Sequence, residues 1–205
     1  VSAEAIARHG ASLAIDQADQ RVMREIQNGI KTDFFTFLKT APTKVSGTGL
    51  QGALAQTWGK LQTFSEFDGS PIVSFVSSLD VADYLGDKAV GADASNVFGM
   101  TLLKNFLGMQ NVIVLPNVSQ GKVYSTAVEN IVLAYLDVNS SDLGGMFADY
   151  TDETGLIASG RDRSLSNLTY ESVFFGALKL FAEIPAGVIE ATIDAPAAAS
   201  TPTEG

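Results

Sequence analysis

The sequence predicts a mixed α+β fold, with helices first, helices and strands mixed in the middle, and strands dominant towards the end. Three observations support this class. In the first part of the chain, apolar residues recur at spacings of three and four, as on one face of a helix. Short apolar runs bounded by turn residues follow, and these are typical of buried strands. After Gly121, the chain is rich in valine, isoleucine, tyrosine and leucine, which favours strands over helices.

The composition excludes several classes of protein. The chain has 205 residues, which suits one large domain or two small ones, and it contains no cysteine, which excludes disulfide frameworks and cysteine-type zinc sites. Its single histidine, His9, leaves little scope for a transition-metal site. The formal net charge of -10 argues against binding to nucleic acid or to an anionic membrane. Only 18% of the residues are charged, and such neutral surface often contacts other subunits.

The helical pattern is clearest where apolar residues recur every three or four positions. Leu50, Leu54, Trp58 and Leu61 make the strongest such series. The predicted helices span 16–30, a separate short segment 34–38, 50–64, 78–85 and 95–107, the last with Phe98, Leu102 and Phe106 on one face.

The remaining segments are predicted as strands, turns and loops. Buried strands are expected at 72–76 and 111–115, two strands within 122–137 that bend at Glu129-Asn130, and strand structure over 168–193 that is broken at 185–187. A polar loop is expected at 40–49. Residues 138–166 are weakly patterned, and the Ala/Pro/Thr/Ser tail at 194–205 is predicted to be disordered.

One glycine motif suggests a nucleotide-binding loop. The segment from Gly47 to Gly52 matches G-x-G-x-x-G and precedes a predicted helix, whose N-terminus would hold a pyrophosphate. The motif needs a strand before it, and the segment 40–46 with Pro42 and Lys44 makes a poor central strand. We therefore favour a flexible loop that enters an amphipathic helix.

Acidic residues cluster in the second half of the chain. Six acids and no base lie between Lys122 and Arg161. The segment 137–142 resembles the start of a calcium loop, but Asp142 stands where that loop needs glycine, so a polar turn is favoured. Asp149, Asp152 and Glu153 are predicted to face basic residues of a neighbouring subunit, with Arg161 and Arg163 as their candidate partners. The sequence indicates no catalytic, cofactor or metal site.

A series of segments in the same order resembles a known family. Together they are similar to tailed-phage major capsid proteins with the Hong Kong 97 capsid fold, over about two-thirds of the chain. The matching segments are 50–56, Asp80-Val81-Ala82-Asp83-Tyr84-Leu85-Gly86, Phe98-Gly99, 105–108, 121–126, Glu129-Asn130 and 170–176.

The resemblance implies an axial domain, made of helices around a small sheet, and part of a peripheral domain. On this reading, residues 1–49 are a helical segment left from the spine or peripheral domain, and 50–167 form the axial domain. A long strand at 168–193 returns to the peripheral domain, and 194–205 is the tail. Family members carry an N-terminal arm and an extended loop before the axial domain, and the resemblance implies that both are missing here.

The implied function is structural and not enzymatic. The chain would be a major capsid subunit of a tailed phage or prophage, forming pentamers and hexamers of an icosahedral shell around DNA. Its partners would be copies of itself, with scaffolding or decoration proteins, and without a cofactor, specific nucleic-acid binding or membrane contact. It would be found in the virion and be assembled in the bacterial host cytoplasm. The alternatives are an encapsulin-type compartment shell and a nucleotide-binding enzyme that uses Gly47 to Gly52.

Overall fold

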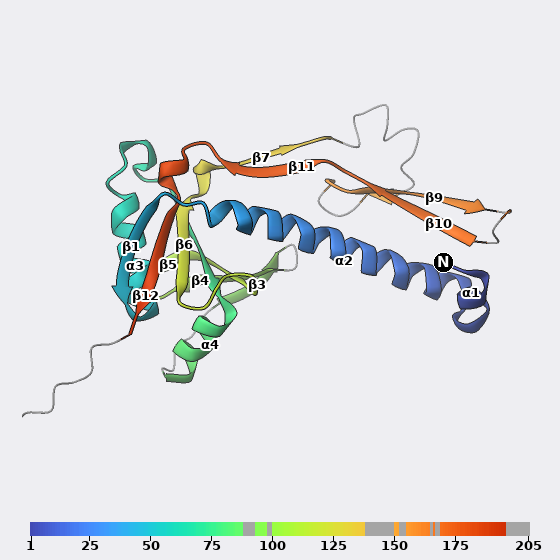
Figure 1. Ribbon diagram of the computed structural model, residues 1–205, viewed down its shortest axis with the longest axis horizontal. Coiled ribbons are helices and arrows are strands. Elements are labelled where there is room, and N and C mark those ends of the chain that lie inside the picture. The colour runs from blue at the N-terminus through green and yellow to red at the C-terminus, as the bar shows by residue number, and fades with distance from the viewer. Residues whose placement is uncertain are drawn as a thin grey trace, which may run out of the picture. The chain divides into compact units, whose positions relative to one another are not determined.

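The chain folds into two compact units, which are described here from a computed structural model (Figure 1). The structure describes residues 1–87, 93–97, 100–137, 150–151, 155–164, 166 and 169–195. Unit 1 comprises Val1–Lys31 with Leu133–Leu180, and unit 2 comprises Thr32–Val132 with Phe181–Gly205. Each unit is therefore built from two stretches of chain that are far apart in sequence.

A seven-stranded mixed sheet forms the centre of unit 2. Its strand order is β1-β12-β6-β2-β5-β4-β3. The pairs β1–β12 and β2–β5 are parallel, and the other pairs are antiparallel. The strands are β1 (Thr43–Thr48), β2 (Ile72–Ser77), β3 (Asp93–Val97), β4 (Met100–Phe106), β5 (Met109–Leu115), β6 (Lys122–Ala127) and β12 (Ile189–Asp194).

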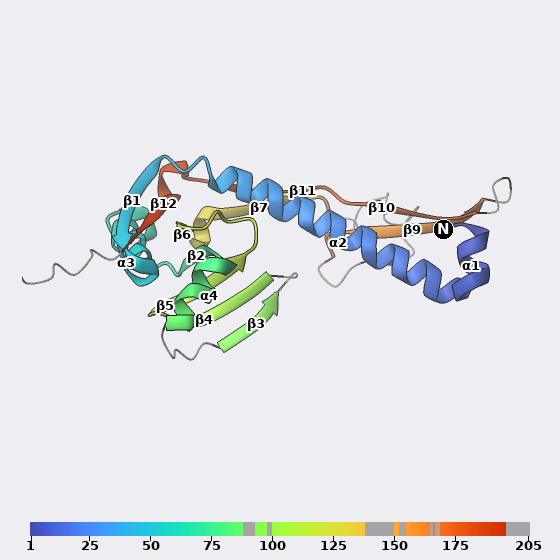
Figure 2. The same ribbon diagram turned by 60° about the horizontal axis from the view of Figure 1, so that its bottom comes forward.

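Helices cover both faces of this sheet (Figure 2). On one face, Leu54 of α3 (Gly49–Leu61) and Val81 of α4 (Ser78–Asp87) share a core with Val76 of β2. Phe75, the residue before Val76 in β2, points to the opposite face because side chains alternate along a strand. There Phe75 meets Phe34 of α2 (Ala11–Leu38), with ring centroids 5.3 Å apart. Burial on both faces explains why β2 reads as a continuous apolar run.

Three 3-10 turns at Ser65–Phe67, Val128–Asn130 and Pro185–Gly187 complete unit 2 beside a second apolar cluster. The Asn130 amide donates to Thr126 Oγ1 at 2.9 Å and to the Ile184 carbonyl at 3.0 Å, and its Oδ1 accepts from the Ile184 amide at 2.7 Å. Gly187 lies so close to Asn130 and Phe67 that a Cβ atom would come within 2.4 Å of the Phe67 ring. Asn130 therefore ties the last two turns together.

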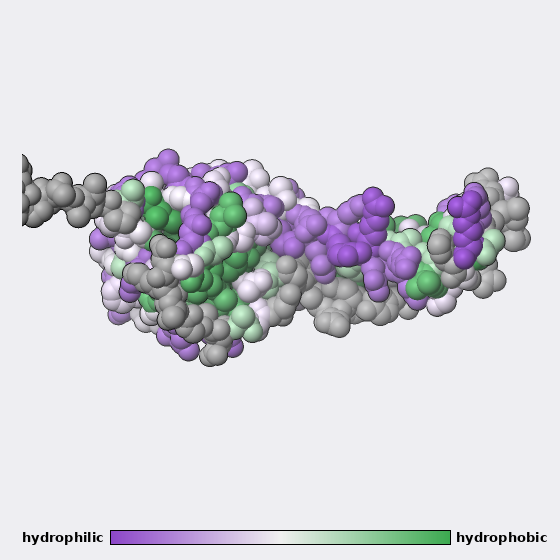
Figure 3. Space-filling model, turned by 90° about the horizontal axis from the view of Figure 1, so that it is seen from below, coloured by the Kyte–Doolittle hydropathy of each residue, from purple (hydrophilic) through white to green (hydrophobic). Residues whose placement is uncertain are grey.

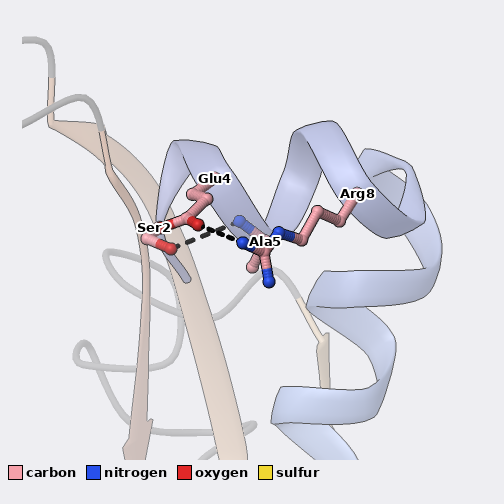
Figure 4. A network of polar contacts seen from close by, with 4 residues as sticks. All are labelled: Ser2, Glu4, Ala5 and Arg8. Atoms are coloured by element: carbon pink, nitrogen blue, oxygen red, sulfur yellow. Dashed lines mark hydrogen bonds and ion pairs between the residues drawn. The ribbon is translucent and has the colours of Figure 1, made fainter.

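Unit 1 contains α1 (Ala3–His9), the first part of α2 and a three-stranded antiparallel sheet of order β10-β9-β8. These strands are β8 (Tyr150–Thr151), β9 (Ala158–Ser164) and β10 (Thr169–Phe175). Ser2 caps α1 by accepting from the Ala5 amide at 3.3 Å, and Arg8 pairs with Glu4 at 2.6 Å (Figure 4). A two-stranded sheet of β7 (Ile131–Tyr135) and β11 (Leu178–Ala182) crosses the limit between the units, as does α2.

The mixed α+β class is confirmed, and so are several of its elements. Helices form at the predicted sites of α3 and α4, and strands form at those of β2 and β5. The bend at Glu129-Asn130 is the 3-10 turn between β6 and β7. Residues 138–149 and 196–205, which include most of the weakly patterned segment and the tail, lie outside the described residues. Among the described helices, none is both long and apolar enough to cross a membrane.

Three predictions about local structure are wrong. Residues 34–38 are not a separate segment, because α2 continues without a break over 28 residues to Leu38. The expected loop at 40–49 contains strand β1, which pairs with β12 near the other end of the chain. The predicted helix 95–107 is instead strand structure, β3 and β4. Strand β1 is stabilised by a partner far away in the sequence, and β4 pairs with its neighbours β3 and β5.

Unit 2 gathers stretches from both halves of the chain, whereas the division into 1–49, 50–167 and 168–193 stays a prediction. Unit 2 takes up Thr32–Val132 because the end of α2 packs on the sheet, and it takes up β12 because that strand pairs between β1 and β6. The pairing of β1 with β12 joins stretches of chain more than a hundred residues apart.

Candidate functional site

The residues predicted to contact a neighbouring subunit fall mostly outside what the structure describes. Asp149, Asp152 and Glu153 lie outside the described residues. Arg163 belongs to β9, but its side chain is not among those described. Arg161 also lies in β9, and its side chain forms an ion pair with a residue of its own chain.

Arg161 forms an ion pair with Asp19 of α2. Its Nη2 lies 2.7 Å from Asp19 Oδ2, and the two side chains are 35% and 13% exposed. The hydrogen bond to Asp19 raises the pKa of the Arg161 guanidinium. The pair ties β9 to the first part of α2 within unit 1. Sequence reasoning missed Asp19 because it lies 142 residues from Arg161, and no spacing rule links a helix residue to a strand residue at that distance.

The glycine motif joins β1 to α3. A Cβ atom at Gly47 would lie 2.4 Å from the backbone carbon of Gly52, so strand and helix approach more closely than a side chain allows. Gly49 begins α3 with a φ of +66°, a left-handed conformation that glycine adopts readily. A strand does precede the motif, contrary to the expected loop, but it is the edge strand of the sheet. Close packing of strand on helix accounts for Gly47 and Gly52.

Buried hydroxyl groups form a chain beneath α3. The Ser125 hydroxyl donates to Thr57 Oγ1 at 2.9 Å and also lies 2.8 Å from Ser74 Oγ. Thr57 donates in turn to the Leu54 carbonyl within α3 at 2.8 Å. Each hydroxyl therefore has a partner, which removes the cost of burying an unpaired polar group. The chain of bonds fastens α3 to β2 and β6.

A second polar group lies on β6 and β12. Lys122 Nζ donates to Glu190 at 2.8 Å and to Thr192 Oγ1 at 2.9 Å. Burial, the negative charge of Glu190 and a hydrogen bond to Glu190 raise the pKa of Tyr124 to about 12. Phe35 of α2 packs edge-on against the Tyr124 ring at 5.7 Å. Tyr124 is therefore protonated at neutral pH. Its described acidic partner, Glu190, is also paired with Lys122.

The carboxylate of Asp80 fastens α4 to the turn before β6. Both of its oxygens accept from the Gly121 amide, at 3.1 and 3.0 Å. Burial raises the pKa of Asp80, and the nearby charge of Asp83 adds to that rise, while the Gly121 hydrogen bond opposes it. Asp83 accepts from Gln120 in the same turn at 3.0 Å. These bonds give Asp80 a structural role inside the segment that carried much of the sequence resemblance.

The described residues offer no group of three or more histidine, cysteine, aspartate or glutamate side chains placed to hold a metal ion. The buried polar groups above are bonded to one another and to the backbone. These bonds hold secondary-structure elements together. Among the described residues, these polar groups use their hydrogen bonds for contacts within the fold.

Large apolar side chains are exposed at several places on the described surface. From the side on which α4 lies in Figure 1, hydrophobic residues gather over unit 2 (Figure 3). On the outer face of α4, Leu79 is 57% exposed and Leu85 is 42% exposed. The others are Leu13, Val22, Trp58, Val128, Leu133, Tyr135, Leu136 and Val173. Such surface is costly in water and is often covered by a protein partner.

Comparisons with known proteins find likeness in structure but not in sequence. No family model matches the chain, and no curated protein matches it. A virus-like particle from Pyrococcus furiosus matches with a TM-score of 0.52 and 12% identity, over 93% of this chain and 72% of that chain. The satellite phage P4 procapsid with its size determination protein matches with a TM-score of 0.36 and 11% identity, over 70% of this chain and 39% of that chain. The chain therefore has a mixed α+β fold similar to that of a virus-like particle protein.

Proposed function

We propose that the chain is a structural subunit that associates with copies of itself into a closed shell. The observation that carries this proposal is the likeness to the Pyrococcus virus-like particle, which extends over 93% of the chain. In a shell, many modest contacts between subunits add up because each later contact forms at a high effective concentration. The exposed apolar residues of unit 1 and unit 2 supply surface for such contacts.

The finer form of the proposal is a major capsid subunit of a tailed phage or prophage, in pentamers and hexamers around DNA. In this form of the proposal, unit 2 with its central sheet and helices would be the axial domain, and unit 1 would be part of the peripheral domain. Scaffolding or decoration proteins are further proposed partners, and the host cytoplasm is the proposed place of assembly. An encapsulin-type compartment shell is the alternative that the same fold supports.

We also propose that Asp149, Asp152 and Glu153 contact basic residues of a neighbouring subunit. Arg161 is held by Asp19 in the single chain, so it meets a neighbour's acids only if it shares its hydrogen bonds or exchanges partners. Arg163 is the second proposed partner. Exchanging both arginines for alanine tests the proposal, since assembly as in the wild type would contradict it.

Electron microscopy and light scattering of the purified protein, at its full natural length, test the shell function. We expect closed particles of uniform diameter. Only monomers or dimers over the whole accessible concentration range would contradict the proposal. Nuclease treatment followed by extraction then separates the two forms: protected DNA supports a phage capsid, whereas enclosed protein without DNA supports a compartment shell.

The nucleotide-binding alternative has its own test. A ligand that binds only the folded state raises the melting temperature. Because Gly47 and Gly52 are explained by packing, we expect NAD and ATP at millimolar concentration to leave the melting temperature unchanged. A rise of several degrees would favour a nucleotide site at this loop.

A further inference from the structure

The outer face of α3 carries a large apolar side chain on one margin and a positive charge on the other. Gly59 marks the middle of this face, since it is exposed and nothing lies within 4 Å of the position that its Cβ atom would take. Successive helix residues are turned by about 100°, so Trp58 and Lys60 lie on opposite sides of Gly59. Trp58 is 49% exposed. Lys60 is the only charged residue of α3, and none of the described acidic groups pairs with it.

The outer face of α4 has the same plan with the opposite charge. Gly86 is exposed, and the space around its Cβ position is as open as at Gly59. With the same turn per residue, Leu85 lies on one margin of the face and Asp83 on the other, about 160° apart. Leu85 is 42% exposed. Asp83 is also exposed, and its Oδ2 accepts from Gln120. The two helices therefore present similar outer faces whose charged margins have opposite sign.

These faces match each other when the helices run antiparallel. Turning one helix end over end brings the apolar margins to the same side, so that Trp58 meets Leu85 while Lys60 meets Asp83. The spacing along the axis agrees as well, because the two residues of each helix are two positions apart, which is about 3 Å. A parallel arrangement would instead place Trp58 against Asp83 and Lys60 against Leu85, which buries charge beside apolar side chains.

The middle of both faces is small and uncharged. Ala55 and Gly59 are exposed one turn apart on α3, and Ala82 and Gly86 are exposed one turn apart on α4. No charged residue lies between the margins of either face. A chain with a net charge of -10 can approach a copy of itself most easily where it carries little charge. Because both faces are exposed in the single chain, the partner that carries the complementary face is a second copy.

We propose that α4 of one copy packs antiparallel on α3 of a second copy. This rests on the proposed shell function, in which each subunit is surrounded by its copies. Trp58 packs on Leu85, and Lys60 pairs with Asp83 at the rim of the contact. The same register carries Leu79, which is 57% exposed, past the last turn of α3, where it lengthens the apolar contact. The contact joins two unlike surfaces, as contacts around a ring of subunits do.

Exchanging the two charges tests the contact. Lys60→Glu changes the net charge from -10 to -12 and Asp83→Lys changes it to -8, so general repulsion between copies would hinder assembly of the first variant and favour that of the second. The proposed pair predicts a different result. Each exchange alone places like charges together, and we expect both variants to need about three- to tenfold more protein for half-assembly.

The variant with both exchanges is the matched control, because its net charge is again -10. It should assemble within about twofold of the wild type, since the pair is restored with its charges reversed. Better assembly of Asp83→Lys than of the wild type would overturn the proposal, and so would a double variant that assembles no better than the single ones. Circular dichroism of the isolated subunits checks that each variant is folded, which matters for Asp83 because of its bond to Gln120.

Tryptophan fluorescence of the wild-type protein gives a second readout, which does not depend on any variant folding. Trp58 is the only tryptophan of the chain, so the emission reports on this contact alone. It should be that of a half-exposed indole in isolated subunits and should shift to shorter wavelength in particles. Particles with unchanged emission would overturn the proposal and leave the shell function standing. Failure to form any particle would contradict the shell function, and this contact with it.

Discussion

Gly47 shows how the absence of a side chain positions two elements. The backbones of β1 and α3 meet at Gly47 and Gly52, where a Cβ atom on Gly47 would lie 2.4 Å from the Gly52 carbonyl carbon. A Cβ atom on Gly52 would find 3.3 Å, which is tight but not impossible. The first of these glycines is therefore the stricter requirement. The motif that suggests a phosphate site in the sequence is used for packing in the fold.

Replacing Gly47 by alanine should destabilise the protein. The added Cβ atom meets backbone and not a flexible side chain, so strand and helix must move apart. We expect the free energy of unfolding to fall by about 1–3 kcal/mol, as in other overpacked sites. Urea denaturation followed by circular dichroism measures the change.

Gly59→Ala is the control for that measurement. Gly59 lies in the same helix, and nothing lies within 4 Å of the position that its Cβ atom would take. We expect alanine there to raise the free energy of unfolding by about 0.5–1 kcal/mol, because glycine weakens a helix interior. Equal effects of the two exchanges would show that the contact between β1 and α3 is not tight.

At the scale of the element, one backbone angle in β4 decides which face Phe106 occupies. Leu103 and Phe106 both lie in the core cluster of unit 2, although they are three residues apart. A regular strand would place them on opposite faces. Asn105 between them has a φ of +54°, which turns the chain and brings Phe106 to the same side as Leu103. The sequence predicts a helix here from the spacing of four between Phe98, Leu102 and Phe106, whereas Leu102 and Phe106 belong to strand β4.

The exchange Asn105→Val tests this account of β4. A β-branched residue is strained in the left-handed region, so we expect the free energy of unfolding to fall by about 1–2 kcal/mol. Asn105→Gly should stay within about 0.5 kcal/mol of the wild type, since glycine adopts this conformation without strain. Urea denaturation measures both variants.

Thr101→Val serves as the matched control in the same strand. Thr101 is exposed, as Asn105 is, and has no positive φ. We expect little change in stability there, because valine suits a regular strand. A large loss at Thr101 as well would mean that β4 does not tolerate valine in general, and the account of Asn105 would fail.

At the scale of the whole molecule, charge opposes association while apolar surface favours it. The net charge of -10 makes copies of the chain repel one another over distances greater than those of direct contact. The described ion pairs lie within the chain, so they do not relieve this repulsion. On the proposed shell function, assembly then depends on contacts that carry little charge, such as the exposed leucines of α4.

Sodium chloride should therefore promote assembly. Raising it from about 0.1 M to about 1 M shortens the screening length from about 10 Å to about 3 Å, which weakens the repulsion between subunits. We expect the protein concentration for half-assembly to fall, as measured by light scattering. Sucrose at matched osmolality is the control, since it leaves the charges unscreened. Weaker assembly in salt would contradict this account and would favour the ion pairs proposed between Arg161 or Arg163 and a neighbour's acids.

The sequence by itself determined the α+β class, the elements α3, α4, β2 and β5, and the bend after β6, because periodic apolar residues and turn residues act locally. Tertiary structure alone decided the strand β1, the strand structure of β3 and β4, and the pairing of Arg161 with Asp19. Each of these depends on a partner distant in the chain or on one unusual backbone angle, and neither leaves a periodic signal.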